Sequence, residues 1–534
     1  MDCAEKFVTL QFRNHRNLFP TSDVKNQLYK TFLLTLLVVA ALIGLFYLPR
    51  LSIGDTLLRR VNILADVQQR DSLGRNLAEA EADSLQGLDP EEVLDPSKVE
   101  VAVIEVEDSV PEGMVAIEDF GSTDGRQRAM DSFYHALGEA KNRPVRIAYF
   151  GDSFVEGDIL TSELRELLQT RFGGRGVGWV DMQSIVAGFR ITVTHSASGW
   201  ADHNANDRSG YNPQLAGIAG RYYVPASTGT TTLKCQEHYY ASHLSSADQA
   251  TIYFTSGGNL SLTASINGQE AQTLRGSGAM AANPEPTYVT QLVPTDSVDE
   301  FGDTVMKEVK VRQEATATVS EGSTGGSGVE AETLHGPVSS ITVRASGNGR
   351  LYGIALDGTR GVTVDNFAMR SGNGWFLKSI PVETLRQFST LRPYDLIILH
   401  YGLNVANKKS KDYSYYTRQM DESIQHLQQA FPNASILVVS VSDRGQRGSD
   451  GQIHTMPGVV ELMQYQRKMA SDNHVAFWNL YEAMGGDGSI ARMKEAKQAN
   501  LDYTHINFEG GKAVAKILFD VLINGKENYN RRHP

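Results

Sequence analysis

The sequence predicts an α/β fold of three layers, a parallel sheet with helices on both faces, interrupted by an inserted all-β domain. Short apolar runs alternate with helical patterns in two blocks, 122–180 and 361–534, and such alternation favours a parallel sheet covered on both faces. Residues 181–360 instead contain many short strand-like runs, which is typical of a β-sandwich or jelly roll. A third observation, the uncharged apolar run at 31–48, predicts an N-terminal transmembrane helix.

The acidic charge of the chain is concentrated in one segment. The 534 residues carry a formal net charge of -12, and residues 71–120 alone hold fifteen Asp or Glu against Arg75 and Lys98. The remainder is near neutral and lacks the basic surface typical of nucleic-acid binding, so we expect no nucleic-acid partner.

Cys3 and Cys235 lie on either side of the predicted membrane helix, which excludes a disulfide, and neither has zinc-type spacing.

The apolar run at 31–48 is interpreted as an uncleaved membrane anchor. Its eighteen residues are near the short end of what spans a bilayer. It ends in FYLP at 46–49 rather than in the small residues of a signal-peptide cleavage site. Residues 1–30 contain five Lys or Arg, which favours a cytoplasmic N-terminal segment and an exported body. Residues 49–121, which are acidic and poor in aromatic side chains, are then a juxtamembrane segment and linker.

The first block centres on residues 144–157, which read PVRIAYFGDSFVEG. Residues 145–150 are mostly apolar, which predicts a buried strand between helical patterns at 126–142 and 163–170. A serine at the end of a central strand, beside a glycine that permits a sharp turn, is where an α/β fold can present a nucleophile. Taken alone, Gly-Asp-Ser is also an ordinary strand-to-helix turn, so the candidacy of Ser153 depends on the rest of the chain.

The connection into the inserted domain, residues 172–179, is rich in glycine. It lacks the preceding strand and following helix of a dinucleotide-binding loop and the Lys-Ser/Thr of a phosphate loop, so we interpret it as a flexible connection.

Within the insertion, strand-like runs are separated by Gly, Ser, Asn and Asp. Aromatic residues of a sandwich are more often core than sugar-binding, and both roles stay open for Trp200, Tyr222, Tyr223 and Tyr240.

The second block supplies the remaining strands and helices of the sheet. Strands are predicted at 362–367, 395–400, 435–441 and 475–480, and helices at 414–431, 459–473 and 507–523. The carboxyl ends of parallel strands meet at one edge of a sheet, where ligands of such folds bind. Because Ser153, Gly372 and Asn404 each follow a predicted strand end, we expect them on the same edge.

These positions together contain the parts of a nucleophilic catalytic site. A hydroxyl nucleophile needs a base, a carboxylate that orients the base, and donors for the developing oxyanion. Ser153 is the candidate nucleophile, His505 the base, and Asp502, three residues before it on a turn, the orienting carboxylate. The backbone N–H groups of Ser153 and Gly372 and the side-chain amide of Asn404 are the candidate oxyanion donors. This chemistry needs no metal and no cofactor.

Three further polar residues near predicted strand ends receive simpler interpretations. Asp152 is expected to be a turn residue, because its side chain lies one position from the nucleophile. His400, at the end of a buried strand, is expected to be a hydrogen-bonded rim histidine rather than a second base. Asp443 either shapes the substrate pocket or caps a loop, and the sequence leaves both roles open.

The order of these motifs resembles the SGNH, or GDSL, hydrolases. The chain presents Gly-Asp-Ser, a loop glycine, Gly-x-Asn and Asp-x-x-His in that order, over about 144–179 and 361–523. The four motif residues and the triad carboxylate that this resemblance implies are Ser153, Gly372, Asn404, His505 and Asp502. The loop glycine has alternatives in Gly374, Gly174 and Gly176; Gly372 is preferred because it follows a strand and lies shortly before Asn404.

A closer resemblance is to the periplasmic peptidoglycan O-acetylesterases of that family. In those proteins a β-sandwich resembling a carbohydrate-binding module is inserted between the first and second blocks, and the insertion at 181–360 has that place and character. Met484-Gly485-Gly486 is also similar to their sequence. The resemblance implies an exported serine esterase that removes O-acetyl or other acyl groups from a polysaccharide or peptidoglycan through an acyl-serine. It also implies a single-pass anchor in the bacterial inner membrane and a catalytic body in the periplasm.

Two alternatives to this function stay open. An O-acetyltransferase of cell-envelope glycan would resolve the same acyl-serine with a sugar hydroxyl, and its membrane anchor would suit a membrane acyltransferase partner. A non-catalytic glycan-binding protein would keep the insertion without using the triad. The insertion itself either holds polymer near Ser153 and raises its effective concentration or forms a wall of the active-site cleft.

Overall fold

Residues 105–534 form one compact unit and residues 1–104 another. The computed structural model describes residues 108–121, 128–207, 210–236, 241–256, 259–274 and 328–534. It also describes the backbone of two antiparallel strand pairs, β1 (Ser52–Ile53) with β2 (Thr56–Leu57) and β11 (Tyr288–Val298) with β12 (Thr304–Arg312). The expected membrane helix at 31–48 lies outside the described residues. Among the helices that are described, none is long and apolar enough to span a bilayer.

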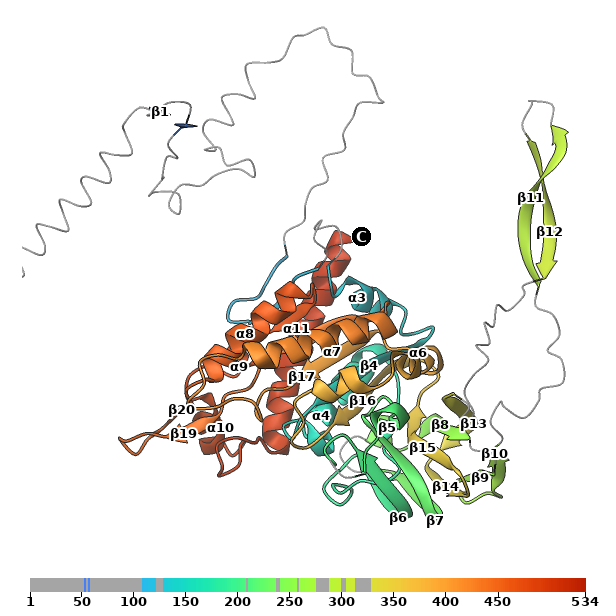
Figure 1. Ribbon diagram of the computed structural model, residues 1–534, viewed down its shortest axis with the longest axis horizontal. Coiled ribbons are helices and arrows are strands. Elements are labelled where there is room, and N and C mark those ends of the chain that lie inside the picture. The colour runs from blue at the N-terminus through green and yellow to red at the C-terminus, as the bar shows by residue number, and fades with distance from the viewer. Residues whose placement is uncertain are drawn as a thin grey trace, which may run out of the picture. The chain divides into compact units, whose positions relative to one another are not determined.

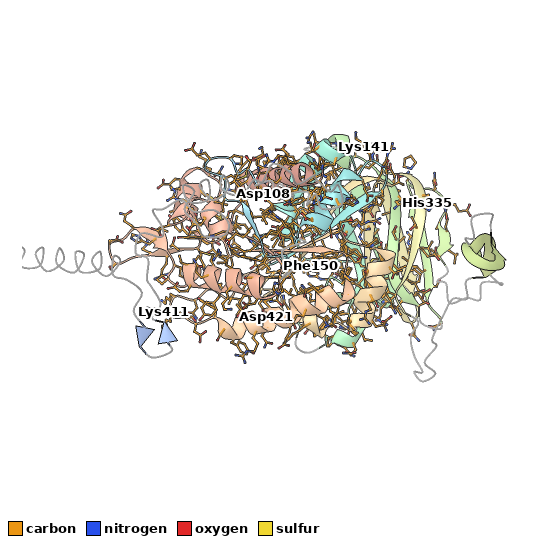
Figure 2. The ribbon with its side chains drawn as sticks, turned by 90° about the horizontal axis from the view of Figure 1, so that it is seen from above. Asp108, Lys141, Phe150, His335, Lys411 and Asp421 are labelled. Carbon is orange, nitrogen blue, oxygen red and sulfur yellow. The ribbon has the colours of Figure 1, made fainter. Side chains whose placement is uncertain are left out.

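A six-stranded sheet forms the centre of the α/β part of the larger unit (Figure 1). Its order is β16 (Gly361–Ala368), β4 (Pro144–Gly151), β17 (Leu396–His400), β18 (Ser435–Val439), β21 (Ala476–Trp478) and β3 (Ile117–Asp119). The first five strands are parallel and, numbered along the chain, have the order 2-1-3-4-5 of flavodoxin-like folds. Phe150 of β4 lies among the packed side chains (Figure 2), fully buried and stacked on Phe367 with ring centroids 4.9 Å apart.

The sixth strand is a correction to the expected all-parallel sheet. β3 pairs antiparallel with β21, although residues 117–119 belong to the segment expected to be linker. Three residues are too few to give a periodic apolar pattern, and the pairing partner lies in the distant second block. The α/β layer that the sequence predicts is confirmed, with this antiparallel edge strand added.

Two groups of helices cover the sheet (Figure 1). On one face lie α3 (Asp131–Gly138), α4 (Thr161–Phe172) and α11 (Phe508–Arg532), and on the other α6 (Val382–Leu391), α7 (Ser414–Ala430) and α8 (Val459–Asp472). This follows from right-handed crossovers, because the chain moves from β4 to β16 in one direction and from β16 to β17 in the other. The helices predicted at 414–431, 459–473 and 507–523 are confirmed, whereas α6 has no predicted counterpart.

Shorter elements lie in the loops of the larger unit. These are the 3-10 turns η2 (Glu156–Asp158), η3 (Pro213–Leu215) and η4 (Trp375–Ser379), the short helices α5 (Ala241–Leu244), α9 (Leu480–Ala483) and α10 (Ser489–Glu495), and the paired strands β19 (Gly445–Arg447) and β20 (Ile453–Thr455). Of these, η2 matters most for the site, because it directly follows the Gly-Asp-Ser turn.

The predicted all-β region is present as a nine-stranded antiparallel sheet. Its strands are β5 (Gly178–Val180), β6 (Val193–Asn204), β7 (Arg221–Cys235), β8 (Ala247–Ser256), β9 (Ser261–Ile266), β10 (Gln272–Leu274), β13 (Glu330–Val338), β14 (Ser340–Ser346) and β15 (Gly349–Asp357). β15 meets β7 at one pair of residues, Leu351 and Tyr223, so two nearly separate parts result, β10-β9-β14-β7-β6 and β13-β8-β15-β5. Both contribute to one buried cluster, for example Leu233 from the first and Ile252 from the second.

Three of the four aromatic residues considered for sugar stacking belong to the core. Trp200, Tyr222 and Tyr223 are at most 7% exposed, so their rings are not available to a sugar at the surface. Tyr240 lies outside the described residues. The core interpretation is therefore confirmed for the three that can be placed.

The glycine-rich connection at 172–179 is built into the fold, and its interpretation as a flexible connection is wrong. Trp179 is 1% exposed, its backbone N–H donates to the Asp365 carboxylate at 2.8 Å, and its ring packs on Phe367. Gly178 has a φ of +71°, and a Cβ at this position would collide with the Asp365 carboxylate. Glycine here allows the backbone to approach the sheet closely.

A buried ion-pair network joins the all-β region to the α/β sheet. Arg392, which follows α6, is fully buried and donates to Asp365 of β16 at 2.6 and 2.8 Å and to Asp357 of β15 at 2.5 and 3.0 Å. Tyr394 donates to Asp365 at 2.6 Å. Burial alone would raise the pKa of Asp365, but the Arg392 guanidinium and the Tyr394 hydroxyl hold it below its ordinary value. Asp365 therefore stays charged and depends on Arg392.

Removal of Arg392 should destabilise the larger unit strongly. In Arg392→Met, the carboxylates of Asp357 and Asp365 lose their buried counter-charge, so we expect the free energy of unfolding to fall by about 3–5 kcal/mol. Arg386→Met, on the helix that precedes Arg392, is the matched control, because that side chain is 52% exposed and should change stability by at most about 0.5 kcal/mol. Urea denaturation measures both, and equal stability of the two variants would contradict the role of Arg392.

Candidate active site

The turn after β4 presents Ser153 at the carboxyl edge of the sheet. β4 lies between β16 and β17 and ends at Gly151. The Asp152 side chain accepts the backbone N–H of Phe154 at 3.0 Å, which closes the turn. Gly157 and Asp158, with φ of +67° and +64°, then redirect the chain into α4. The expected strand-to-helix turn is thus observed, with Ser153 at its apex.

The structure brings together the three residues proposed as a triad. His505 Nε2 lies 2.9 Å from Ser153 Oγ, and His505 Nδ1 lies 2.7 Å from Asp502 Oδ2. The other carboxylate oxygen of Asp502 accepts the backbone N–H groups of Thr504 at 3.0 Å and His505 at 3.1 Å. Burial alone would raise the pKa of Asp502, but these hydrogen bonds, above all the one from His505, lower it. A charged Asp502 favours the proton on Nδ1, which leaves Nε2 free to accept from Ser153.

The loop that carries the triad base is fixed at both ends. Ala499 and Ile506 form an antiparallel bridge, and Asn500 donates its backbone N–H to the carbonyl of His505 at 2.8 Å. Directly afterwards, Asn507 caps the N-terminus of α11 by accepting the backbone N–H groups of the first turn. The imidazole is therefore positioned by a short rigid loop between α10 and α11.

Asn404 follows β17 and lines the same cavity as Ser153. Its side-chain Nδ2 donates to the Gly372 carbonyl at 3.0 Å and to Asp152 Oδ2 at 3.3 Å. Asp152 is fully buried and also accepts the backbone N–H groups of Gly402 and Leu403. Burial raises the pKa of Asp152 to about 6, against the lowering effect of these bonds. Asp152 is thus more than a turn residue, because it also orients the amide of Asn404.

The geometry at Gly372 differs from the expectation. Its backbone N–H donates to the Met369 carbonyl at 2.9 Å, which closes a tight turn, and its own carbonyl accepts from Asn404. Arg370 and Ser371 line the cavity at this turn, and Ser371 has a φ of +61°. The amide of Gly372 is engaged within the turn and is not directed at the cavity, so this geometry does not support its expected role as an oxyanion donor.

A cavity of about 490 Å³ opens in front of Ser153, Asn404 and His505. One side of it is apolar: Phe189 and Phe508 line it with ring centroids 5.2 Å apart. Phe189 lies between β5 and β6, in the inserted segment. The insertion therefore forms part of the cavity wall, the second of the two roles left open for it.

The remaining expectations for polar residues near the site have clear outcomes. His400 is 3% exposed, lies 3.0 Å from the Tyr149 hydroxyl through Nδ1, and has its pKa lowered by burial to about 3. It is neutral, as expected of a hydrogen-bonded rim histidine. Asp443 accepts hydrogen bonds from the Thr455 hydroxyl at 2.8 Å and from the backbone N–H of Ile490 at 2.9 Å, which makes it a loop and helix cap.

Among the described residues, no group of three or more His, Cys, Asp or Glu is placed to hold a metal ion.

Comparison with solved structures finds a protein of similar fold. The chain is similar to a peptidoglycan O-acetylesterase with a TM-score of 0.55 and 18% sequence identity, over 77% of this chain and 99% of that one. It thus shares the fold of that esterase.

Two further structures are more distant. An acetyl xylan esterase matches with a TM-score of 0.21 and 16% identity, over 30% of this chain and 80% of that one. A family two carbohydrate esterase from Cellvibrio japonicus matches with a TM-score of 0.22 and 11% identity, over 62% and 99%. No protein-family profile and no curated protein matches the chain.

Replacement of Asn404 tests the oxyanion assignment. Asn404→Ala should lower kcat for p-nitrophenyl acetate by about 10²–10³-fold, the usual cost of one preorganised donor, with little change in KM. Asn407→Ala is the control, since this asparagine lies on the same loop and its side chain accepts only the N–H of Lys409. A raised KM with unchanged kcat would make Asn404 a substrate-binding residue instead.

The buried Asp152 predicts a pH dependence of stability. Its pKa of about 6 in the folded protein lies above the ordinary value of 3.8, so the folded protein binds the extra proton between these values. The favourable contribution of Asp152 to the free energy of unfolding is therefore complete below about pH 4, and it is lost as the pH rises through about 6. Relative to Asp152→Asn, the unfolding free energy of the natural protein should fall over this range and level off above it. Urea denaturation from pH 4 to 8 measures the difference, and a flat profile would contradict the raised pKa.

Proposed function

We propose that this protein is a serine esterase of the SGNH type that removes acetyl groups from the hydroxyls of a glycan. The observation that carries the proposal is the unbroken chain of hydrogen bonds from Asp502 through His505 to Ser153, at the mouth of an open cavity. This arrangement matches the requirements of a hydroxyl nucleophile with an oriented base. The SGNH/GDSL-like fold, shared with a peptidoglycan O-acetylesterase, supports the same chemistry.

In the first half-reaction, Ser153 Oγ attacks the ester carbonyl while His505 Nε2 takes its proton. The negative charge on the carbonyl oxygen is stabilised by the backbone N–H of Ser153 and by the side-chain amide of Asn404. One N–H of that amide keeps its bond to Asp152, and the other turns from the Gly372 carbonyl to the substrate oxygen. Asp502 stabilises the imidazolium. The intermediate collapses, His505 returns the proton to the leaving sugar oxygen, and the acetyl group stays on Ser153. In the second half-reaction, His505 activates a water molecule, which releases acetate and restores the serine.

The walls of the cavity suit a small acyl group on a polar chain. The pair of Phe189 and Phe508 provides apolar surface for a methyl group, while most of the other lining residues are polar. We place the enzyme at the bacterial inner membrane with its body in the periplasm, and the uncharged run at 31–48 supports this anchor. Its partners are then the membrane and an acetylated envelope glycan such as peptidoglycan.

Loss of the triad should remove the activity without unfolding the protein. Ser153→Ala and His505→Ala in the full-length chain should each lower kcat for acetate release by about 10³-fold or more, because the triad acts as a unit. Acetate is measured after incubation with O-acetylated peptidoglycan and, separately, with p-nitrophenyl acetate. Release of free acetate, without transfer to an added sugar acceptor, separates this function from that of an O-acetyltransferase.

The matched control is His454→Ala, since this histidine is 53% exposed and its ring contacts Asp450 on a hairpin. It should keep near-natural activity. Near-natural activity in Ser153→Ala or His505→Ala would remove the esterase assignment. Hydrolysis of the small ester alone, with no acetate from any glycan, would keep the triad and reject the glycan substrate.

A further inference from the structure

A second cavity, of about 120 Å³, lies beside the one that contains Ser153. The two share Glu156 and Arg370, whose side chains form an ion pair at 2.7 Å. This ion pair therefore stands at the boundary between the cavities. Asn206, from the loop after β6, donates its side-chain amide to the Arg370 carbonyl and so ties the all-β region to the same boundary.

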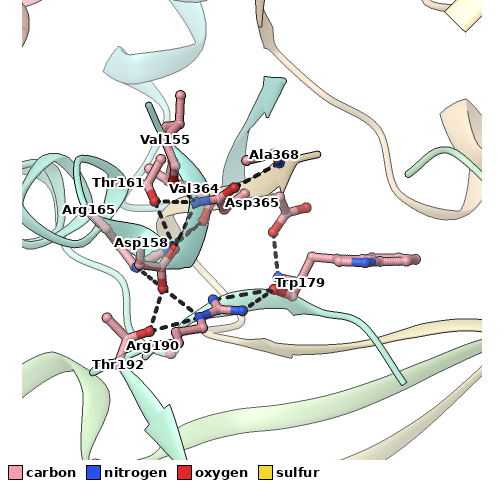
Figure 3. Close-up of polar contacts among 12 residues, drawn as sticks. Val155, Asp158, Thr161, Arg165, Trp179, Arg190, Thr192, Val364, Asp365 and Ala368 are labelled. Carbon is pink, nitrogen blue, oxygen red and sulfur yellow. Dashed lines mark hydrogen bonds and ion pairs between the residues drawn. The ribbon is translucent and has the colours of Figure 1, made fainter. Parts of the chain in front are cut away.

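The walls of this second cavity come from both parts of the larger unit. The α/β part contributes Asp158 and Asn366, and the all-β part contributes Asp181, Asp202 and Arg221. Figure 3 shows the wall around Asp158, where Arg190 from the inserted segment reaches its carboxylate. The cavity therefore exists because the insertion packs on the sheet, and its lining is mainly polar.

The charges in this lining are paired, with one exception. Arg370 pairs with Glu156, Arg190 with Asp158 at 2.8 Å, and Arg221 with Asp181 at 3.1 Å. Asp202 adds a fourth carboxylate, which has a hydrogen bond with Asn204 and the charge of Arg221 nearby. Its Oδ1, however, is buried with no hydrogen-bond donor within reach among the described residues. A buried acceptor without a donor costs free energy, and such groups in native proteins call for a partner.

We propose that this cavity is a subsite for a neutral sugar unit of the glycan, next to the unit whose ester reaches Ser153. The proposal rests on the proposed function, because it extends the same substrate from one cavity into the next. Hydroxyl and N-acetyl N–H groups of a sugar are the donors that Asp202 lacks, and the ion-paired arginines and Asn366 can serve the sugar oxygens. A sugar carboxylate placed against Asp202 would meet a like charge, so a carboxylate-bearing sugar is disfavoured.

The subsite gives the insertion a direct part in substrate recognition. A polymer that fills both cavities is held at two neighbouring units, so an ester on an internal sugar is aligned with Ser153. A single acetylated sugar fills only the first cavity and gains nothing from Asp202. The structure thus links preference for chains over single sugars to one carboxylate of β6.

Binding without chemistry tests this subsite. The full-length chain carrying Ser153→Ala is titrated calorimetrically with chitotetraose, cellotetraose and xylotetraose, and with tetragalacturonate as the anionic counterpart. We expect at least one neutral tetrasaccharide to bind and tetragalacturonate not to bind. Adding Asp202→Ala should weaken binding of the neutral sugar by about tenfold or more. Glu270→Ala, an exposed carboxylate of the same all-β region, should leave it unchanged.

A second variant keeps the test decisive if Asp202→Ala fails to fold. Ala187→Trp, on the loop that lines the cavity, fills the space without removing a buried contact and should abolish tetrasaccharide binding. If none of the neutral sugars binds, or if Asp202→Ala and Ala187→Trp bind as tightly as the parent, the subsite is overturned. Tetrasaccharide binding that depends on Asp202, in a protein that releases no acetate from glycans, would reject the proposed function and keep the subsite.

Discussion

The carboxylate of Asp158 is the interaction on which the geometry of the site depends. It lies five residues after Ser153, fully buried and at a positive φ, and it pairs with Arg165 of α4 and Arg190 of the inserted segment (Figure 3). Thr161, Thr192 and Asn366 complete its hydrogen bonds. Burial alone would raise the pKa of Asp158, but the two guanidinium groups hold it far below its ordinary value. The charge of Asp158 thus connects the turn of Ser153, helix α4, strand β16 and the inserted segment.

A second buried network involves Asp365, the neighbour of Asn366 on β16, where Arg392 joins Asp357 of the all-β region to Asp365 of the sheet. Charges removed from water are costly, and a pair that loses one partner is strongly destabilising. Such networks tolerate few alternative packings. The insertion is consequently held as part of the same compact unit as the sheet, rather than attached to it by a flexible connection. Phe189 lines the cavity of Ser153, and Asp202 lines the neighbouring one.

The site divides its tasks between these parts. Gly-Asp-Ser, the loop of Asn404 and the loop of His505 follow elements of the α/β part and hold the candidate reacting groups, with Asp152 orienting the amide of Asn404. The inserted segment adds an apolar wall to the first cavity and the polar lining of the second. Under the proposed function, the reaction takes place at the rigid strand ends, and the glycan is recognised on the surface between the two regions, where loops can vary without disturbing the sheet.

The sequence by itself determined the α/β fold and the all-β region, and it singled out Ser153, Asn404, Asp502 and His505 as candidates, which the structure brings together. These are readable because apolar runs have local periodicity and because each motif lies directly after a strand end or on a short turn. The antiparallel strand β3, the engaged amide of Gly372, and the placement of Phe189 and Asp202 were decided by the tertiary structure alone. Each of them depends on a partner distant in the chain or on the direction of a single N–H, and such contacts leave no periodic pattern in the residues around them.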